Sequence, residues 1–114
     1  MGEYMDRLEA EKDLSAIDVR YQNTVILLCN LAKKTPIVKR IIIFGSAVSK
    51  QCNNESDIDI CYDISCSTQD QRVRDLSLKT SILCEYNCDV VYYNLIGTNL
   101  KKEIDTKGIT VYEA

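Results

Sequence analysis

The sequence predicts an α/β or α+β fold in which a small mixed β-sheet packs against helices. Segments rich in β-branched residues alternate with amphipathic segments of helical period, which is typical of such folds. Hydrophobic residues make up 46% of the chain and charged residues 27%, the balance of an ordinary globular protein. We expect one domain over residues 1–114, with a helical segment over residues 1–35 and a core over residues 38–112.

A long N-terminal helix is predicted from about Met5 to Lys34. Apolar residues at three- and four-residue steps form one stripe along it, and Pro36 prevents its continuation. An unbroken helix of this length would reach about 45 Å, which exceeds the width of a small domain. The helix therefore either breaks near Ser15 or projects its first half toward a partner.

Three strands are predicted in the middle of the chain. The apolar run Val38–Phe44 indicates a buried strand. A short helical turn over Ala47–Lys50 and a polar loop over Gln51–Glu55 separate it from a second strand, Asp57–Tyr62. The third strand, Cys88–Tyr93, is β-branched and aromatic in character.

Two helices and an edge strand complete the expected order. Thr68 and Gln71 have the spacing of a capping box, which predicts the start of a helix. The apolar stripe of that helix consists of Val73, Leu76, Thr80, Leu83 and Cys84. A short helix is expected over Thr98–Lys107, ended by Gly108, and Ile109–Tyr112 is expected to form an edge strand.

Composition excludes several classes of function. The chain has no histidine, which removes His-based acid–base chemistry, Ser-His-Asp triads and most zinc sites. A net charge of −3 argues against a long nucleic acid as partner, because neutralising many phosphates takes a basic surface, whereas a single nucleotide needs only a local cluster. No segment has the apolar length of a membrane span or the form of a signal peptide, so we expect a cytoplasmic protein.

Six cysteines are expected to be reduced thiols, because the core is built from Ile, Leu and Val and no secretory signal is seen. No Cys-x-x-Cys pair exists, and Cys84 and Cys88 are four residues apart. Most of the thiols should behave as small buried hydrophobes. Cys52, in the polar loop, is expected to be exposed.

The most informative motif joins Gly45-Ser46 to Asp57 and Asp59, after an interval of ten residues. Glycine at the end of a strand lets the backbone approach a ligand closely, and serine offers a hydroxyl beside amides that favour phosphate. Side chains alternate across a strand, so Asp57 and Asp59 share one face. Two adjacent carboxylates repel each other unless a cation lies between them, and Mg²⁺ suits such a site.

Asp89 is the candidate third carboxylate. It lies in an otherwise apolar strand, where an unpaired buried charge is costly, so it should meet a cation or hydrogen-bond donors. If its strand lies beside that of Asp59, at a spacing of about 4.8 Å, the three carboxylates can converge. Two-metal catalysis, with metals about 3.5–4 Å apart, would then be available.

In this order and spacing, the motif resembles that of the DNA polymerase β-type nucleotidyltransferase superfamily. Within it the chain is most similar to the minimal nucleotidyltransferases (MNT), over roughly Val38 to Tyr112. The resemblance implies a nucleotidyltransferase-like fold and transfer of AMP from ATP onto a hydroxyl, with release of pyrophosphate. Many MNT proteins are antitoxins of toxin–antitoxin systems, paired with a HEPN-domain ribonuclease toxin that they adenylylate on a tyrosine.

The resemblance also implies roles for individual residues. Asp57 and Asp59 would bind magnesium, and Asp89 would bind metal and help deprotonate the acceptor. Gly45 and Ser46 would hold the triphosphate of ATP. The implied partners are ATP with Mg²⁺ and a HEPN-type protein, and an oligomer is possible.

One position departs from the family's pattern. Ser49 and Lys50 stand where family members often carry a basic residue followed by a glycine. Lys50 could act as a point charge on the triphosphate, and Lys39, Arg40 and Lys79 are further candidate cations.

Plainer interpretations remain for each part taken alone. Gly45-Ser46 fits an ordinary turn, Asp57 and Asp59 fit a solvated strand face, as does Asp63 on the same parity, and Asp89 fits a salt-bridged acid. Together, in this order, they favour catalysis. Two alternatives are an antitoxin-like binding module with weak or no activity, motivated by Ser49, and a response-regulator phosphoacceptor domain. The latter is disfavoured because such folds place their acids at the end of the first strand.

Overall fold

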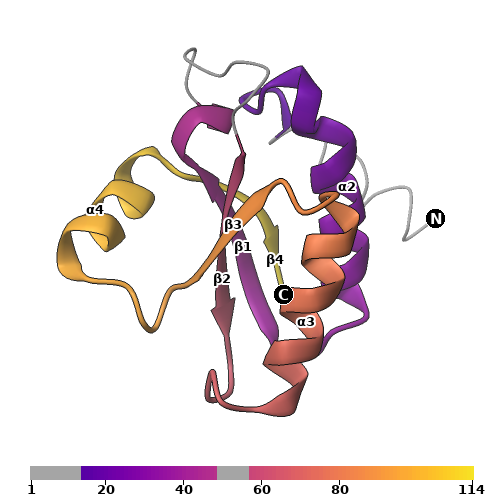
Figure 1. Cartoon of the computed structure of the whole chain (residues 1–114). Helices are drawn as coiled ribbons and strands as arrows, with labels where there is room; N and C mark the ends of the chain where they lie inside the picture. Colours follow the sequence, from indigo (N-terminus) through magenta and orange to yellow (C-terminus); the bar gives the residue numbers. More distant parts are fainter. Residues whose placement is uncertain (1–13, 49–56) are drawn as a thin grey trace.

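A four-stranded mixed sheet with helices on both faces forms the centre of the protein (Figure 1). The structure is a computed structural model and describes residues 14–48 and 57–114. The strands lie in the order β3-β2-β1-β4. Strand β1 (Val38–Phe44) pairs antiparallel with β2 (Ile58–Ile64) and β4 (Ile109–Glu113), and β2 pairs parallel with β3 (Cys88–Tyr92). The predicted α/β class with a small mixed sheet is confirmed.

Helix α2 spans Val19–Lys33 and is 15 residues long. Its N-cap is Asp18, whose carboxylate accepts a hydrogen bond from the backbone N–H of Arg20 at 2.9 Å. Residues 15–17 form a turn, so the helical segment is broken near Ser15, as one of the two predicted alternatives requires. The part of the predicted helix before residue 14 lies outside the described residues.

The first two strands follow the prediction closely, while the connection between them differs in part. A 3₁₀ helix, η1, spans Gly45–Val48, two residues earlier than the predicted turn. Residues 49–56 lie outside the described residues, and with them Ser49, Lys50, Cys52 and the predicted polar loop. Strand β2 continues to Ile64, beyond its predicted end, because two further residues pair with β1.

Helix α3 (Gln71–Leu83) begins with a different cap from the predicted one. Asp70, not Thr68, is the N-cap, and its carboxylate accepts a hydrogen bond from the backbone N–H of Arg72 at 2.9 Å. The Arg72 guanidinium donates to the same carboxylate, and these bonds lower the pKa of Asp70 to about 2. The carboxylate is a stronger acceptor than the Thr68 hydroxyl, which explains why the predicted capping box does not form. Helix α4 spans Thr98–Lys107, as predicted.

The two faces of the sheet bury two separate clusters of apolar side chains. Helices α2 and α3 lie on one side and α4 on the other (Figure 1). Alternation along β2 sends Ile58, Ile60 and Tyr62 into the larger cluster, under α2 and α3. Residues of opposite parity, Cys61 among them, face α4 in a smaller cluster with Ile42, Phe44 and Ile104. The odd-numbered aspartates of β2 therefore lie on the α4 face.

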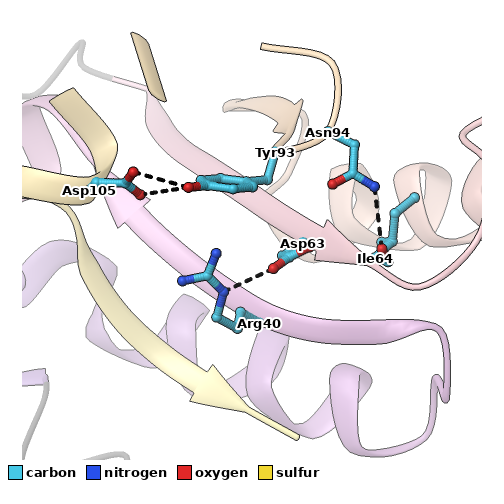
Figure 2. Close-up of polar contacts among 6 residues, drawn as sticks. All are labelled: Arg40, Asp63, Ile64, Tyr93, Asn94 and Asp105. Atoms are coloured by element: carbon cyan, nitrogen blue, oxygen red, sulfur yellow. Dashed lines mark hydrogen bonds and ion pairs between the residues drawn. The ribbon is translucent and has the colours of Figure 1, made fainter. Parts of the chain in front are cut away.

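A polar cluster near the start of β1 holds α4 against the sheet (Figure 2). The Arg40 Nε atom lies 3.0 Å from Oδ2 of Asp63. Asp63 is buried, whereas the sequence predicts that it lies on a solvated strand face. The Arg40 guanidinium also stacks over the ring of Tyr93 at 4.9 Å. The Tyr93 hydroxyl in turn donates to Asp105 of α4, at 2.9 and 3.0 Å. Asp63 is tolerated in a buried position because Arg40 pairs with it.

Within the described part of the chain, no helix is long and apolar enough to cross a membrane. The described cysteines are free thiols, of which Cys29, Cys61 and Cys84 are buried and Cys66 and Cys88 are half-buried. The prediction that most thiols act as small core residues is therefore confirmed for these three.

The larger cluster contains one buried hydroxyl pair, which generates a prediction. The hydroxyls of Tyr62 and Thr80 lie 2.7 Å apart, and both side chains are fully buried. Tyr62→Phe should lower the free energy of unfolding by about 1–3 kcal/mol, because it leaves the Thr80 hydroxyl buried without its partner. Urea denaturation of Tyr62→Phe, Thr80→Val and the double variant measures this. We expect the double variant to recover most of the loss, and strictly additive losses would contradict the pairing.

Candidate functional site

Strand register brings two of the predicted carboxylates together. Phe44, the last residue of β1, lies opposite Asp59 of β2, and Asp59 is aligned with Asp89 of β3. Aligned residues on neighbouring strands project from the same face, at a strand spacing of about 4.8 Å. Asp59 and Asp89 are therefore neighbours on the α4 face, at the end of the sheet where β1 finishes and β2 and β3 begin.

Gly45 closes this end of the sheet and is required there for two reasons. Its φ of +70° is a left-handed conformation that residues with a side chain rarely adopt. A Cβ atom at this position would overlap Oδ2 of Asp59 and would lie 3.1 Å from Cγ of Asp59. The backbone at Gly45 thus packs directly against the Asp59 carboxylate, and the glycine turn and the aspartate strand form one unit.

Ser46 is half-buried and follows Gly45 in η1. Its hydroxyl therefore belongs to the same end of the sheet as Asp59. A backbone hydrogen bond from Asp18 N–H to the carbonyl oxygen of Ala47, at 2.8 Å, ties this short helix to the start of α2. The turn that carries Ser46 is thereby held between β1 and α2.

Asp57 occupies a different position from the other two aspartates. It is exposed, directly before the first residue of β2, and two residues from Asp59. Across residues 14–48 and 57–114, no three Asp, Glu, Cys or His side chains lie close enough to hold one metal ion. The arrangement is thus a neighbouring pair, Asp59 and Asp89, with Asp57 at the entrance to the strand.

Negative charge accumulates around Asp59. Burial raises the pKa of the Asp59 carboxyl, and the charges of Asp89, Asp57 and Glu103 raise it further. Glu103 comes from α4, and sequence reasoning missed it because a glutamate on an amphipathic helix looks like any solvated residue. Only the docking of α4 on this face reveals that Glu103 belongs to the surroundings of the site.

The residues of this site fit Mg²⁺. Their donors are hard carboxylate oxygens, and every influence on the Asp59 pKa disfavours its charged form, which a divalent cation would reverse. Mg²⁺ usually binds one or two carboxylates and completes its shell with water and substrate phosphates, so it needs no cage of three acids.

Two of the candidate cations with described positions, Arg40 and Lys79, lie elsewhere. Arg40 is paired with Asp63 and precedes Gly45 by five residues, which corresponds to about 16 Å along a strand. Lys79 is exposed on α3, which covers the opposite face of the sheet. These positions do not support the interpretation of Arg40 and Lys79 as triphosphate ligands.

The close packing of Gly45 on Asp59 gives a test of the site's geometry. Gly45→Ala should lower the free energy of unfolding by more than about 2 kcal/mol, from the left-handed backbone and the overlap together. In an Asp59→Ala background the overlap disappears, so the cost of Gly45→Ala should fall by about half. Gly97→Ala is the matched control, because nothing lies within 4 Å of its added Cβ, and it should cost less than about 1 kcal/mol. Equal costs of Gly45→Ala in both backgrounds, by urea denaturation, would contradict the contact.

Asp59 also generates a pH-dependent prediction for the protein without metal. Because its pKa in the folded state lies above the ordinary 3.8, its contribution to stability is lost as the pH rises through that pKa. Asp59→Asn should therefore raise the free energy of unfolding at neutral pH in the presence of EDTA. This gain in the free energy of unfolding over the wild type should shrink as the pH falls toward 3.8. Thermal unfolding from pH 3 to pH 8 measures it, and a variant that is less stable at pH 7 would refute the charge repulsion.

Comparison with known proteins is consistent with this geometry. Residues 27–114 match the family described as Polymerase beta, Nucleotidyltransferase. No curated protein sequence matches the chain.

Several solved structures share the fold. One, a toxin–antitoxin with AMP-PNP, has a TM-score of 0.64 and 24% identity, over 81% of this chain and 73% of that chain. A second, the toxin–antitoxin MntA-HepT, has a TM-score of 0.56 and 23% identity, over 81% and 69%. A third contains a tri-AMPylated Shewanella oneidensis HEPN toxin in complex with MNT antitoxin, with a TM-score of 0.55 and 21% identity, over 79% and 73%.

The family match includes both strands that carry the aspartates and the glycine turn between β1 and η1. It covers well over half of the chain, and the nucleotidyltransferase fold agrees with it. The chain belongs to the polymerase β nucleotidyltransferase family, as the spacing of its glycine, serine and aspartates predicts.

Proposed function

We propose that this protein transfers AMP from ATP onto a hydroxyl of a partner protein in a Mg²⁺-dependent reaction. The observation that carries the proposal is the alignment of Asp59 with Asp89 beside the glycine turn at Gly45. This alignment gathers negative charge at one end of the sheet. A hard cation can bind there and complete its coordination with oxygens of a triphosphate. A cytoplasmic location, where ATP and Mg²⁺ are available, suits this activity.

Each residue of the site has a role in the proposal. Asp57, Asp59 and Asp89 would hold magnesium, in the two-metal arrangement typical of this chemistry, and the metal would neutralise phosphate charge. The backbone at Gly45 and the hydroxyl of Ser46 would hold the triphosphate, together with Lys50. Asp89 is exposed, so an acceptor on another macromolecule can reach it.

The transfer step is an in-line displacement at the α-phosphorus of ATP. The acceptor oxygen forms a bond to this phosphorus while the bond to the β-phosphate bridging oxygen breaks, and pyrophosphate leaves. Asp89 would accept the proton that the acceptor hydroxyl loses. Positioning and charge neutralisation supply most of the rate enhancement in such reactions.

The proposed acceptor is a tyrosine on a HEPN-type toxin. The support is that one structure of the same fold contains a tri-AMPylated HEPN toxin in complex with MNT antitoxin, and another contains AMP-PNP. The chain would then be the antitoxin of a toxin–antitoxin system and would act by modifying its toxin.

A second candidate function is an antitoxin-like module that binds its partner with weak or no transferase activity. The favouring observation is that no three acids in the described ranges are gathered into one metal-holding group. Ser49, where the family often has a basic residue, points the same way. On this alternative the fold would serve recognition alone.

Label transfer from ATP separates the two functions. With labelled ATP, Mg²⁺ and a HEPN partner, the wild-type protein should label the partner, and Asp57→Asn/Asp59→Asn should lower the rate by about 100-fold or more. Asp75→Asn is the matched control, because Asp75 is an exposed acid on α3, away from the site, and it should retain full activity.

Circular dichroism should show that the double variant keeps its fold. Wild-type activity in that variant would refute the assignment of the carboxylates. A tight complex with no label transfer from the wild-type protein would establish the second function instead.

A further inference from the structure

Two thiols meet where helix α3 joins strand β3. Cys84 is the C-cap of α3 and is buried, and Cys88 is the first residue of β3 and is half-buried. Only three residues separate the two cysteines, and both pack in the larger apolar cluster that contains Tyr62. The short connection and the shared cluster therefore place both thiols on the same side of the sheet.

The turn between them has an unusual backbone. Glu85 and Tyr86 have positive φ angles of 54° and 64°, and Asn87 N–H donates to the carbonyl oxygen of Cys84 at 2.9 Å. Two central residues with positive φ are the mark of a type I′ turn, which ordinarily carries Gly, Asn or Asp at these places. The tight reversal brings the end of α3 back onto the start of β3, and so brings Cys84 to Cys88.

This turn leads directly into the candidate site. Cys88 is aligned with Ile58 of β2, and the next residue, Asp89, is aligned with Asp59. The carbonyl of Asn87 accepts a hydrogen bond from Ile58 N–H at 3.2 Å, which anchors the end of the turn to β2. A covalent change at Cys88 therefore alters the residue that immediately precedes the site carboxylate Asp89.

We propose that Cys84 and Cys88 form a redox modification site, at which a peroxide converts the thiol pair into a disulfide that fixes the α3–β3 turn in front of Asp89. Nothing in this inference depends on the transferase activity. The proposed transfer reaction uses neither of the two side chains.

The chemistry takes two balanced steps. Hydrogen peroxide oxidises the more accessible thiol, Cys88, to a sulfenic acid and is itself reduced to water. The sulfur of Cys84 then attacks the Cys88 sulfur, the S–O bond breaks, and a second water leaves as the disulfide forms. Burial and the neighbouring Cys88 raise the pKa of Cys84 to about 12, which disfavours its thiolate form.

The test is oxidation of the full chain in a Cys52→Ser background, followed by alkylation and peptide mass mapping. Hydrogen peroxide should lower the mass of the folded protein by about 2 Da and link Cys84 to Cys88, and a thiol reductant should reverse both changes. The amide resonance of Asp89 should shift on oxidation. Two thiols that stay fully alkylatable, or a disulfide that leaves the Asp89 amide unmoved, would overturn the proposal.

Two variants make the test specific. Cys84→Ser should abolish the mass loss and leave Cys88 as a sulfenic acid that dimedone traps. Cys66→Ser is the matched control, because Cys66 is also half-buried, and it should form the Cys84–Cys88 link as the parent does. A mass loss that persists in Cys84→Ser, or a disulfide that fails to form in Cys66→Ser, would show that a different pair of thiols reacts.

Discussion

The close approach of the Gly45 backbone to the Asp59 carboxylate is the constraint on which the rest of the site depends. It requires a residue without a side chain in a left-handed conformation, at the point where β1 ends. It also requires the antiparallel register that sets Phe44 opposite Asp59. With Asp59 fixed in this way, the parallel pairing of β2 and β3 brings Asp89 to its side. Three segments that are distant in the sequence are thus joined through one half-buried carboxylate.

The two faces of the sheet have different roles. Helices α2 and α3 cover one face and bury the larger apolar cluster, which supplies most of the hydrophobic stabilisation. The other face carries the aspartates of β2 and is covered by α4 above a smaller cluster. Along this face, Asp63 is neutralised by Arg40, whereas the influences on Asp59 are all those of burial and negative charge. Strand β2 therefore carries one acid, Asp63, that stabilises the fold through its ion pair, and a second, Asp59, that is suited to binding a cation.

Much of this fold could be predicted from the sequence, because its elements have strong periodic signals. Strand β1 and helix α4 have their predicted bounds, and β4 lies at an edge of the sheet as expected. The predicted start of α3 is wrong because Thr68 and Asp70 both suit an N-cap. Only the structure shows which of the two side chains accepts a hydrogen bond from a backbone N–H. Glu103 and the burial of Asp63 could not be predicted, because both depend on where α4 docks and which partner Arg40 finds. The pairing of Asp59 with Asp89 followed from the assumption that their strands are neighbours, which the sheet order confirms.

Binding of a metal–nucleotide complex tests the central claim most directly. A crystal structure of the protein with Mn²⁺ and a non-hydrolysable ATP analogue would locate the metal by its anomalous signal. The account predicts an anomalous peak in contact with the carboxylates of Asp59 and Asp89, with the triphosphate lying over the backbone of Gly45. A nucleotide bound at another part of the protein, or a metal that contacts neither carboxylate, would contradict it.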